Sequence, residues 1–582
     1  IWINEQEWMK SQTHLKSNKT KYDAATRILI DLARLRWTIK QENAGIELNS
    51  PQFYPGNKVT AEQISEYKTT VRTELNHICA EQFRQSSVKK FIERLEKPHK
   101  SCKFSSILQL IADGNEVYSR IEPALKLKED EREKLLSKVI RPYLQLVPGD
   151  GDKQILDEYT KIPLNEIWRY FRYTWSIPQL SIPGRTMLYL IRDAGHPTHA
   201  IMGIAALNNT AMMLKPRDTF IGWNRDAFYN EIIEALKSQK PEQNLKKLFE
   251  KLEKNIEFGL NMIDPSGLVS DDEIQTPTQE IIRRLREKGE EFSKLREKAL
   301  KNIHSEVDQP ELLQDLEFFE ESPIQISPEV LEIDKTKSTK EMKEVLKVLV
   351  RKKRAFELSH LLFARCVIQK YSERFLDTKT TKEVIKTDEF SSAVNYALQA
   401  NKSAHVGSNL LEITTCGAVA PYNLLLGGKL TALLMMSPKI NFDYQQRYNN
   451  QPSIISSQLK NAPVFRDNRL VYLGTTSLYA LGSSQYERIK LPRGVISPDQ
   501  PEIKYYPIGY SSGFGTVQFM PDTVRATENV LEEKLGFQNV NHIFGEGPSP
   551  KLRKIRAGLE ELGFDASVLL KHNQPRKIYG VS

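Results

Sequence analysis

Two groups of strand-like segments, separated by a long charged helical stretch, constrain the fold of this chain more than any other feature. The first group holds the apolar runs MLYLIRDAG and HAIMGIAALNN, which His196 and Pro197 separate. Short β-like runs on either side of a turn indicate a hairpin. The second group holds SNLLEITTCGAVAP and RLVYLGTTSLYALGSSQYERI. Strands that alternate with helices and short turns indicate α/β structure, so 161–224 and 404–500 are predicted to form two parts of one sheet domain.

The stretch between these two groups, residues 225–403, is predicted to be a helical insertion. Leu285, Phe292 and Ala299 recur at a spacing of seven, which is typical of a short heptad seam. Because only about three heptads are present, an intramolecular helical hairpin and a contact in a homo-oligomer both remain open. We expect the insertion to hold protein partners.

The two ends of the chain are predicted to form further units. Residues 1–160 have helical periodicity, and Thr60 with Gln63 has the pattern of a capping box at the start of a long helix. Residues 501–582 combine a strand-like segment with two helices and are predicted to be a basic C-terminal α/β unit.

The charge of the chain favours an anionic partner. Lys and Arg number 83 against 74 Asp and Glu, which gives a net charge of +9 and a pI of about 9.0. Nucleic acid, and DNA in particular, is the partner that such a balance favours. The four cysteines are scattered without a CxxC pair, which favours a reducing compartment, so we expect a cytoplasmic protein. No run reaches about 18 apolar residues, so no membrane span is expected.

Five motifs occur in an order that resembles a known family. They are LYLIRDAGHPTHAIMGIAAL, KPRDTFIGW, LLEITTCGAVAPYNLLLGGKLTALLMMSP, GTTSLYALGSSQYERI and FGEGPSPKLRKIRAGLEELG, and they span about 185–582 apart from the insertion. Together they resemble the DruA family of the bacterial Druantia anti-phage defence system. The resemblance implies a role in phage defence beside other Druantia components, including a large helicase-like protein. It does not imply a known reaction.

A glycine turn in the second sheet part is a candidate cofactor site. Free amides at the start of a helix attract anions, so Gly427, Gly428 and Lys429 are candidate cofactor-binding residues. The order of hairpin, strand, glycine turn and helix resembles an acyl-CoA-dependent acetyltransferase core, in which this turn cradles a pyrophosphate. The sequence departs from that core because Leu424 replaces a basic or Gln residue and the Gly-x-Gly spacing is missing. Close helix–strand packing is the alternative role, and no cofactor is assigned. We therefore expect an α+β, largely helical fold with a split, acetyltransferase-like sheet domain.

Two residues near this turn are candidate catalytic groups. Glu412 lies in the strand before the turn, and Tyr486 lies in the later helix. In an acetyltransferase-like site a carboxylate deprotonates an amine and a tyrosine protonates a leaving thiolate. Cys416 has no evident base near it in the sequence. The alternative is that Glu412 pairs locally and Tyr486 belongs to the core.

Cations crowd the first turns of the predicted terminal helix. Positive charge at a helix N-terminus opposes the macrodipole, and a phosphate there would relieve the conflict. An exposed helix that nearby carboxylates or salt screen is the alternative. The candidate nucleic-acid-binding residues are Lys551, Arg553, Lys554, Arg556, His572 and Arg576.

Three other groups of residues are candidate nucleic-acid or metal sites. Aromatic residues alternate with arginine in WRYFRYTW at 168–175, which suits stacking on bases, but the spacing also fits a helix that buries its rings, and we favour that interpretation. A basic run at 89–97 is interpreted as a solvated helix face rather than a phosphate contact. The histidines form no HExxH motif, and we predict no metal site.

The sequence therefore favours a DNA- or RNA-binding component of a phage-defence complex. An acyltransferase-like enzyme that modifies protein or nucleic acid is the second hypothesis, and a purely structural scaffold is the third. Whether the chain is an enzyme is left open.

Overall fold

The computed structural model describes the ranges 19–34, 37–42, 45–50, 60–83, 86–149, 152–175, 184–306, 337–372, 378–495, 497–511, 519–535, 550–571 and 575–581. The chain forms two compact units. The terminal unit combines 1–63, 294–347 and 510–576, and the sheet unit combines 64–293, 348–509 and 577–582.

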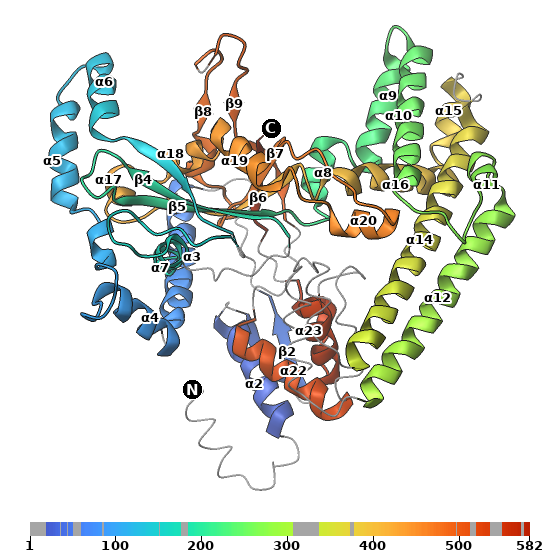
Figure 1. Ribbon diagram of the computed structural model, residues 1–582, viewed down its shortest axis with the longest axis horizontal. Coiled ribbons are helices and arrows are strands. Elements are labelled where there is room, and N and C mark those ends of the chain that lie inside the picture. Colours follow the sequence, from blue (N-terminus) through green and yellow to red (C-terminus); the bar gives the residue numbers. More distant parts are fainter. Residues whose placement is uncertain are drawn as a thin grey trace. The chain divides into compact units, whose positions relative to one another are not determined.

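A seven-stranded sheet forms the centre of the sheet unit, with the strand order β10-β11-β7-β6-β5-β4-β3 (Figure 1). The strands are β3 (Pro142–Leu146), β4 (Thr186–Asp193), β5 (Ile201–Asn209), β6 (Leu410–Ala418), β7 (Tyr472–Thr476), β10 (Tyr506–Tyr510) and β11 (Lys577–Val581). β4 and β5 pair antiparallel, so the predicted hairpin is confirmed. β6 and β7 run parallel, whereas β3–β4, β5–β6 and β7–β11 are antiparallel.

The sheet draws on more of the chain than the two predicted parts. β3 comes from the range 1–160, which the sequence assigned to a helical domain, and β10 and β11 come from the C-terminal range. A short hairpin, β8 (Lys490–Leu491) with β9 (Ile503–Lys504), projects beside this sheet (Figure 1). The mixed sheet within a largely helical chain confirms the α+β class.

Helices cover both faces of the sheet. One face, called here the α19 face, packs against α5, α17, α18 and α19, and the other, the α7 face, packs against α4 and α7. The helices around the sheet are α3 (Ala61–Gln82), α4 (Ser86–Glu96), α5 (Gly114–Leu125), α6 (Glu129–Val139), α7 (Leu164–Arg172), α8 (Lys215–Ile221), α17 (Tyr422–Leu425), α18 (Lys429–Leu434), α19 (Pro438–Tyr448), α20 (Ile454–Lys460) and α21 (Ser484–Glu487).

The predicted helical insertion separates β5 from β6, and its described residues contain helices and no strand. It forms a core of its own from residues such as Leu245, Phe249 and Leu252, which recur at helical spacing and bury one face of α10. Figure 1 shows α9, α10, α14 and α16 grouped beside one another. The helices are α9 (Arg225–Lys237), α10 (Pro241–Asn261), α11 (Asp271–Gln275), α12 (Gln279–Glu306), α14 (Lys337–Ser372), α15 (Thr378–Val384) and α16 (Asp388–His405).

The terminal unit joins the two ends of the chain. Ile28 and Leu32 of the first described helix share a core with Ile555 and Leu559 near the C-terminus. The predicted capping box is confirmed, because the amide nitrogens of Thr60 and Gln63 donate to each other's side chains at 3.0 and 3.3 Å. The elements are α2 (Lys19–Arg34), β1 (Thr38–Glu42), β2 (Gly45–Asn49), α22 (Pro521–Leu535), α23 (Pro550–Glu561) and α24 (Ala566–Leu569).

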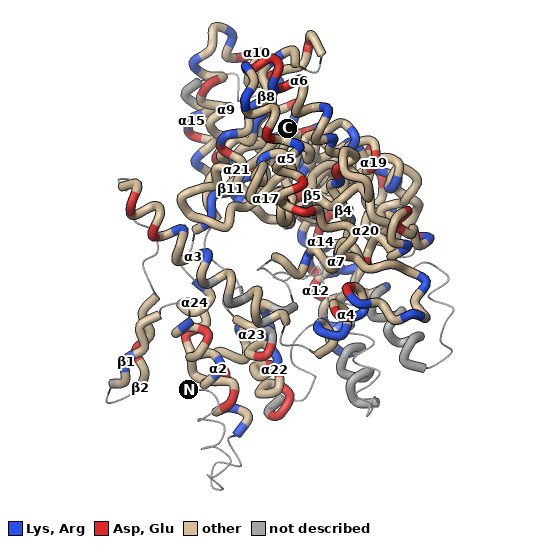
Figure 2. The backbone as a smooth tube through the Cα atoms, turned by 90° about the vertical axis from the view of Figure 1, so that its left-hand side faces the viewer, with Lys and Arg blue, Asp and Glu red and all other residues tan. Residues whose placement is uncertain are grey.

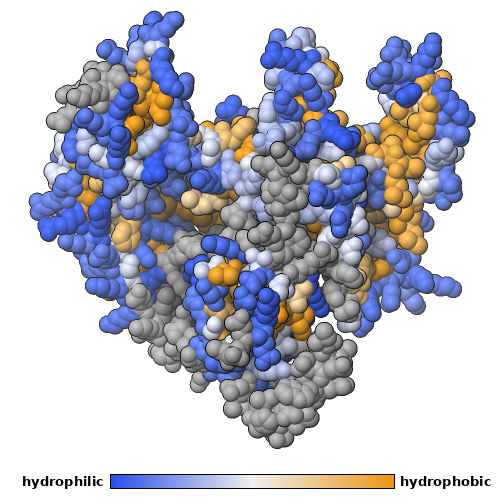
Figure 3. All heavy atoms as spheres, turned by 180° about the vertical axis from the view of Figure 1, so that it is seen from behind, coloured by the Kyte–Doolittle hydropathy of each residue, from blue (hydrophilic) through white to orange (hydrophobic). Residues whose placement is uncertain are grey.

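The surface in Figure 3 is mostly hydrophilic, and apolar residues gather on it in separate bands. Among the described residues, no helix has both the length and the apolar character that crossing a membrane requires.

Candidate functional site

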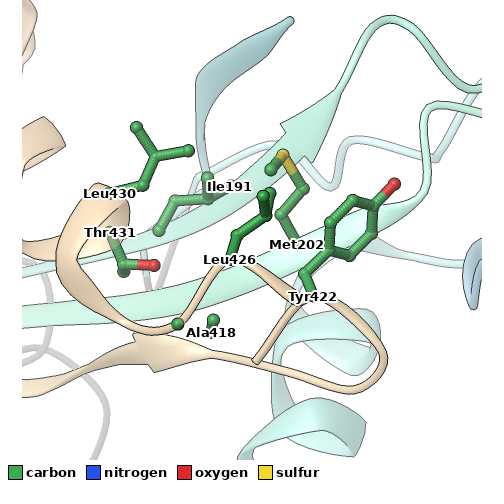
Figure 4. A pocket seen from close by; sticks show the side chains of 8 residues that line it. Ile191, Met202, Ala418, Tyr422, Leu426, Leu430 and Thr431 are labelled. Carbon is green, nitrogen blue, oxygen red and sulfur yellow. The ribbon is translucent and has the colours of Figure 1, made fainter. Parts of the chain in front are cut away.

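The glycine turn after β6 wraps an apolar pocket. Gly427 has a φ of 72°, a conformation that glycine adopts without strain. Gly428 is needed for another reason, because a Cβ there would lie 2.7 Å from the side-chain oxygen of Gln485. The cavity has a volume of about 10 Å³, which holds at most one water molecule. Its lining is mainly apolar (Figure 4) and consists of Ile191, Met202, Ala418, Tyr422, Leu426, Gly427, Leu430 and Thr431.

The parallel strands β6 and β7 diverge close to this turn. They pair only where 410–413 faces 472–475. Beyond that point, Gln485 of α21 donates from Nε2 to the backbone oxygen of Cys416 at 3.0 Å. The side-chain amide of Gln485 therefore hydrogen-bonds to β6 beyond the point where its backbone pairing with β7 ends.

Tyr486 and Cys416 lie together on the α19 face. The Tyr486 ring packs against Tyr505 and Tyr579, with centroids 5.1 and 5.4 Å apart. Burial raises the pKa of Tyr486, and it raises the pKa of the Cys416 thiol to about 12. A thiol with this pKa stays protonated near neutral pH, so Cys416 does not present a thiolate nucleophile.

Glu412 points to the opposite side of the sheet. Its Oε1 accepts a hydrogen bond of 3.2 Å from Thr210, while the adjacent Ile413 packs in the same core as Tyr486. Burial raises the pKa of Glu412 to about 7, against the lowering influence of Thr210 and Arg217. The structure therefore does not bring the two candidate catalytic groups together, because the sheet lies between Glu412 and Tyr486.

A buried network of charges that was not predicted from the sequence lies beside Glu412. Arg217 of α8 has no exposed surface, donates to Asp218 at 2.6 Å and reaches Thr210 at 2.7 Å. Lys402 of α16, which is 3% exposed, donates to the other oxygen of Asp218 at 2.6 Å. Arg and Asp stand side by side in KPRDTFIGW, which is a signal that the sequence offered. The sequence offered no such signal for Lys402, because it lies near the C-terminal end of the insertion, far from Arg217 in the chain.

Two more features lie beside this network. The buried Tyr472 hydroxyl has no hydrogen-bond partner among the described residues. Burial raises its pKa, and the charge of Glu412 raises it further whereas that of Arg217 lowers it. Gly474 of β7 lies opposite Gly580 of β11. Because neither residue has a side chain, the space beside them is filled by Glu412 and Tyr472. A Cβ at Gly474 would lie 2.4 Å from Oε1 of Glu412, and a Cβ at Gly580 would lie 2.7 Å from the Tyr472 ring.

A second buried carboxyl group, that of Asp193, fixes the turn between β4 and β5. Asp193 is fully buried and accepts from Arg120 and from the Tyr422 hydroxyl, both at 3.0 Å. It also accepts from the backbone amides of Arg141 and Gly195 at 2.9 and 2.8 Å. Because every partner is a donor, Asp193 has a structural role as the anchor that joins this turn to α5 and α17.

The predicted aromatic cluster divides between core and surface. Trp168 is 3% exposed and donates from its indole nitrogen to Ala205 at 3.1 Å, and Phe171 is also buried. The interpretation of this helix as one that buries its rings therefore holds for these two residues. Arg169 and Tyr173 instead lie at the surface, where the guanidinium of Arg169 donates to the Tyr173 hydroxyl at 3.1 Å.

The predicted C-terminal cations lie in the terminal unit, on or near α23. Lys554 forms an ion pair of 3.6 Å with Glu528, and Arg553 is half-buried. Arg556 is exposed. Arg576 is half-buried and pairs through its backbone with Ser511. His572 and the side chain of Lys551 lie outside the described residues. The helix therefore does not present its cations as one exposed set.

Candidate metal ligands do not converge in the described part of the chain, where no group of three or more His, Cys, Asp or Glu side chains is placed to hold an ion.

The fold and these sites define an α+β protein whose mixed sheet is split by a helical insertion. The chain belongs to the DruA family, because the family model described as Druantia protein DruA matches residues 115–237 and 397–582, more than half of its length. Most of the helical insertion falls between these two matches.

A curated relative supports the same assignment. Druantia protein DruA of Escherichia coli (strain UMEA 4076-1) is 33% identical to this chain over 173 residues, which are 29% of this chain and 38% of the E. coli protein. The match therefore spans less than half of that relative. No solved structure matches the chain.

Proposed function

We propose that this chain is a component of a Druantia-type anti-phage defence system and that it binds nucleic acid within a multiprotein complex in the cytoplasm. Membership of the DruA family supports the defence role. The helical insertion has its own core and falls largely outside the family matches, which makes it a natural place for protein partners such as a helicase-like component or a second copy of the chain.

The excess of positive charge carries the nucleic-acid part of the proposal. A net charge of +9 attracts a polyanion, and neutralisation of phosphates releases the counterions condensed on them. The exposed Arg556 on α23 supports a contribution from the terminal helix, although the ion pair of Lys554 with Glu528 reduces the set expected there.

Binding of labelled single- and double-stranded DNA between about 50 and 200 mM salt tests this proposal. We expect log Kobs to fall linearly with log salt concentration, and the double variant R553E/R556E to weaken binding. Absence of any binding at the lowest salt concentration would refute the nucleic-acid function.

A second candidate, an acyltransferase-like enzyme, is favoured by one specific observation. The parallel strands β6 and β7 separate within the sheet, and a glycine turn follows β6. The small apolar cavity and the position of Gln485 argue against a ready-made cofactor cleft. Calorimetric titration with acetyl-CoA tests this candidate. Binding that Gly427→Trp removes would support it, and absence of binding would exclude it.

A further inference from the structure

Helices α4 and α7 meet beside the sheet and leave a cationic surface exposed. Val88, Phe91 and Leu95 bury one side of α4, and the other side faces outward. Lys90, Arg94 and Lys97 follow each other at the spacing i, i+4, i+7, so they share that outward side. Figure 2 shows the basic segments along α4, with α7 beside it.

The three lysines of this surface form no ion pair with the described part of the protein. They are Lys89, Lys90 and Lys97, and all three are exposed. Of the carboxylates nearby, Glu166 forms an ion pair of 2.9 Å with Arg94, and Glu96 accepts a hydrogen bond of 2.7 Å from the Tyr170 hydroxyl. Glu93 is an exposed carboxylate on the same helix.

A fixed guanidinium from α7 joins these lysines. Arg169 is exposed, lies over the Phe91 ring at 4.4 Å and donates to the Tyr173 hydroxyl. Arg94 approaches the same Phe91 ring at 5.7 Å, so the cations of the two helices converge there. Because ring contacts hold both guanidinium groups, little side-chain entropy is lost when they meet an anion.

Aromatic surface lies next to these cations. Phe83 is 36% exposed, and its ring centroid is 6.4 Å from that of the half-buried Tyr173. Exposed rings beside a basic surface suit unpaired bases, which stack on aromatic side chains regardless of sequence. A duplex keeps its bases stacked inside and gains nothing from these rings.

We propose that the α4–α7 surface, defined by Lys89, Lys90, Lys97, Arg169, Phe83 and Tyr173, is a binding site for single-stranded nucleic acid. Phosphates contact the lysines and Arg169, and a base stacks on Phe83. The inference rests on the proposed nucleic-acid function and names the surface and the strand form for it.

The test compares three charge reversals in the full-length protein by binding to labelled single-stranded DNA. K89E/K90E removes two of the proposed phosphate contacts. K246E/K247E makes the same change of charge at two exposed lysines of α10, in the insertion, and R553E/R556E makes it on α23. We expect K89E/K90E to weaken binding about tenfold more than K246E/K247E does. We also expect it to lower the salt slope by about 1.4, since each phosphate contact on a single strand accounts for about 0.7.

A second variant removes the ring without changing charge. Phe83→Ala should weaken binding to single-stranded DNA about fivefold or more, leave duplex binding unchanged and leave the salt slope unchanged. Thermal unfolding of each variant confirms that the fold is retained.

Each other outcome overturns the inference. Equal loss in K89E/K90E and K246E/K247E would mean that only net charge matters, and loss confined to R553E/R556E would place the site on α23. An equal effect of Phe83→Ala on single and double strands would contradict the stacking role. In all three cases the native chain still binds nucleic acid, so failure of the inference is distinct from failure of the proposed function, in which the native chain does not bind. Retained DNA binding by K89E/K90E together with loss of an acidic protein partner would assign the surface to that partner instead.

Discussion

Replacement of Glu412 by glutamine tests how enclosure in the sheet unit affects the ionisation of a half-buried carboxyl group. The side chain lies between Thr210, whose hydroxyl donates to Oε1, and Gly474, which leaves the space that the carboxyl group fills. Glutamine has nearly the same shape and keeps an oxygen for the Thr210 hydroxyl. The substitution therefore removes one property, the ability to ionise, and leaves the packing almost unchanged.

The expected magnitude follows from the shift in pKa. Burial raises the pKa of Glu412 from the ordinary 4.5 to about 7, a difference of about 2.5 units, and each unit corresponds to about 1.4 kcal/mol, so the effect is about 3 kcal/mol at most. The folded chain binds this proton more tightly than the unfolded chain does. The stabilisation is therefore complete below pH 4.5 and is lost as the pH rises through about 7. Glutamine does not titrate, so the variant does not undergo this loss.

Thermal unfolding of the native chain and Glu412→Gln at about pH 5 and about pH 8 measures the effect. We expect the variant to gain stability relative to the native chain by about 2–3 kcal/mol between these two pH values, slightly less than the maximum because the unfolded chain is already largely ionised at about pH 5. Glu250→Gln, the same change at an exposed position of α10, is the matched control and should show no such gain. A difference between Glu412→Gln and the native chain that is the same at both pH values would refute the reasoning.

Three further predictions concern the same unit. Asp218→Ala leaves the Lys402 ammonium and its neighbouring guanidinium buried without a counter-charge, and should lower the free energy of unfolding by about 3–5 kcal/mol in urea titrations. Gly474→Ala places a methyl group 2.4 Å from Oε1 of Glu412 and should destabilise by about 1–3 kcal/mol, a loss that a second substitution, Glu412→Ala, should partly reverse. The Cys416 thiol, with a pKa raised to about 12, should react with iodoacetamide more slowly in the folded chain than in denaturant, as mass spectrometry would show. Equal rates of alkylation in the two states would contradict the burial of this thiol.

The local pattern of the sequence determined several of the strands and helices, although it did not predict β3, which lies in a range assigned to a helical domain. The apolar runs around His196 predicted the β4–β5 hairpin, and Thr60 with Gln63 predicted a helix start, because both signals depend on residues a few positions apart. The charged helical stretch between β5 and β6 was recognisable for the same reason, since it repeats a helical period over many turns. The family motifs likewise lie in contiguous segments of the chain.

Only the tertiary structure decided where the candidate site residues point. Strand alternation alone would place Glu412 and Cys416 on one face, but β6 carries an extra residue at Thr414 opposite β5, and this bulge turns Cys416 to the face of Tyr486. The charged side chains near Glu412 belong to Arg217 and, through Asp218, to Lys402 at the C-terminal end of the insertion. A local sequence pattern does not specify these contacts, because they join segments that are far apart in the sequence and meet only in the folded protein.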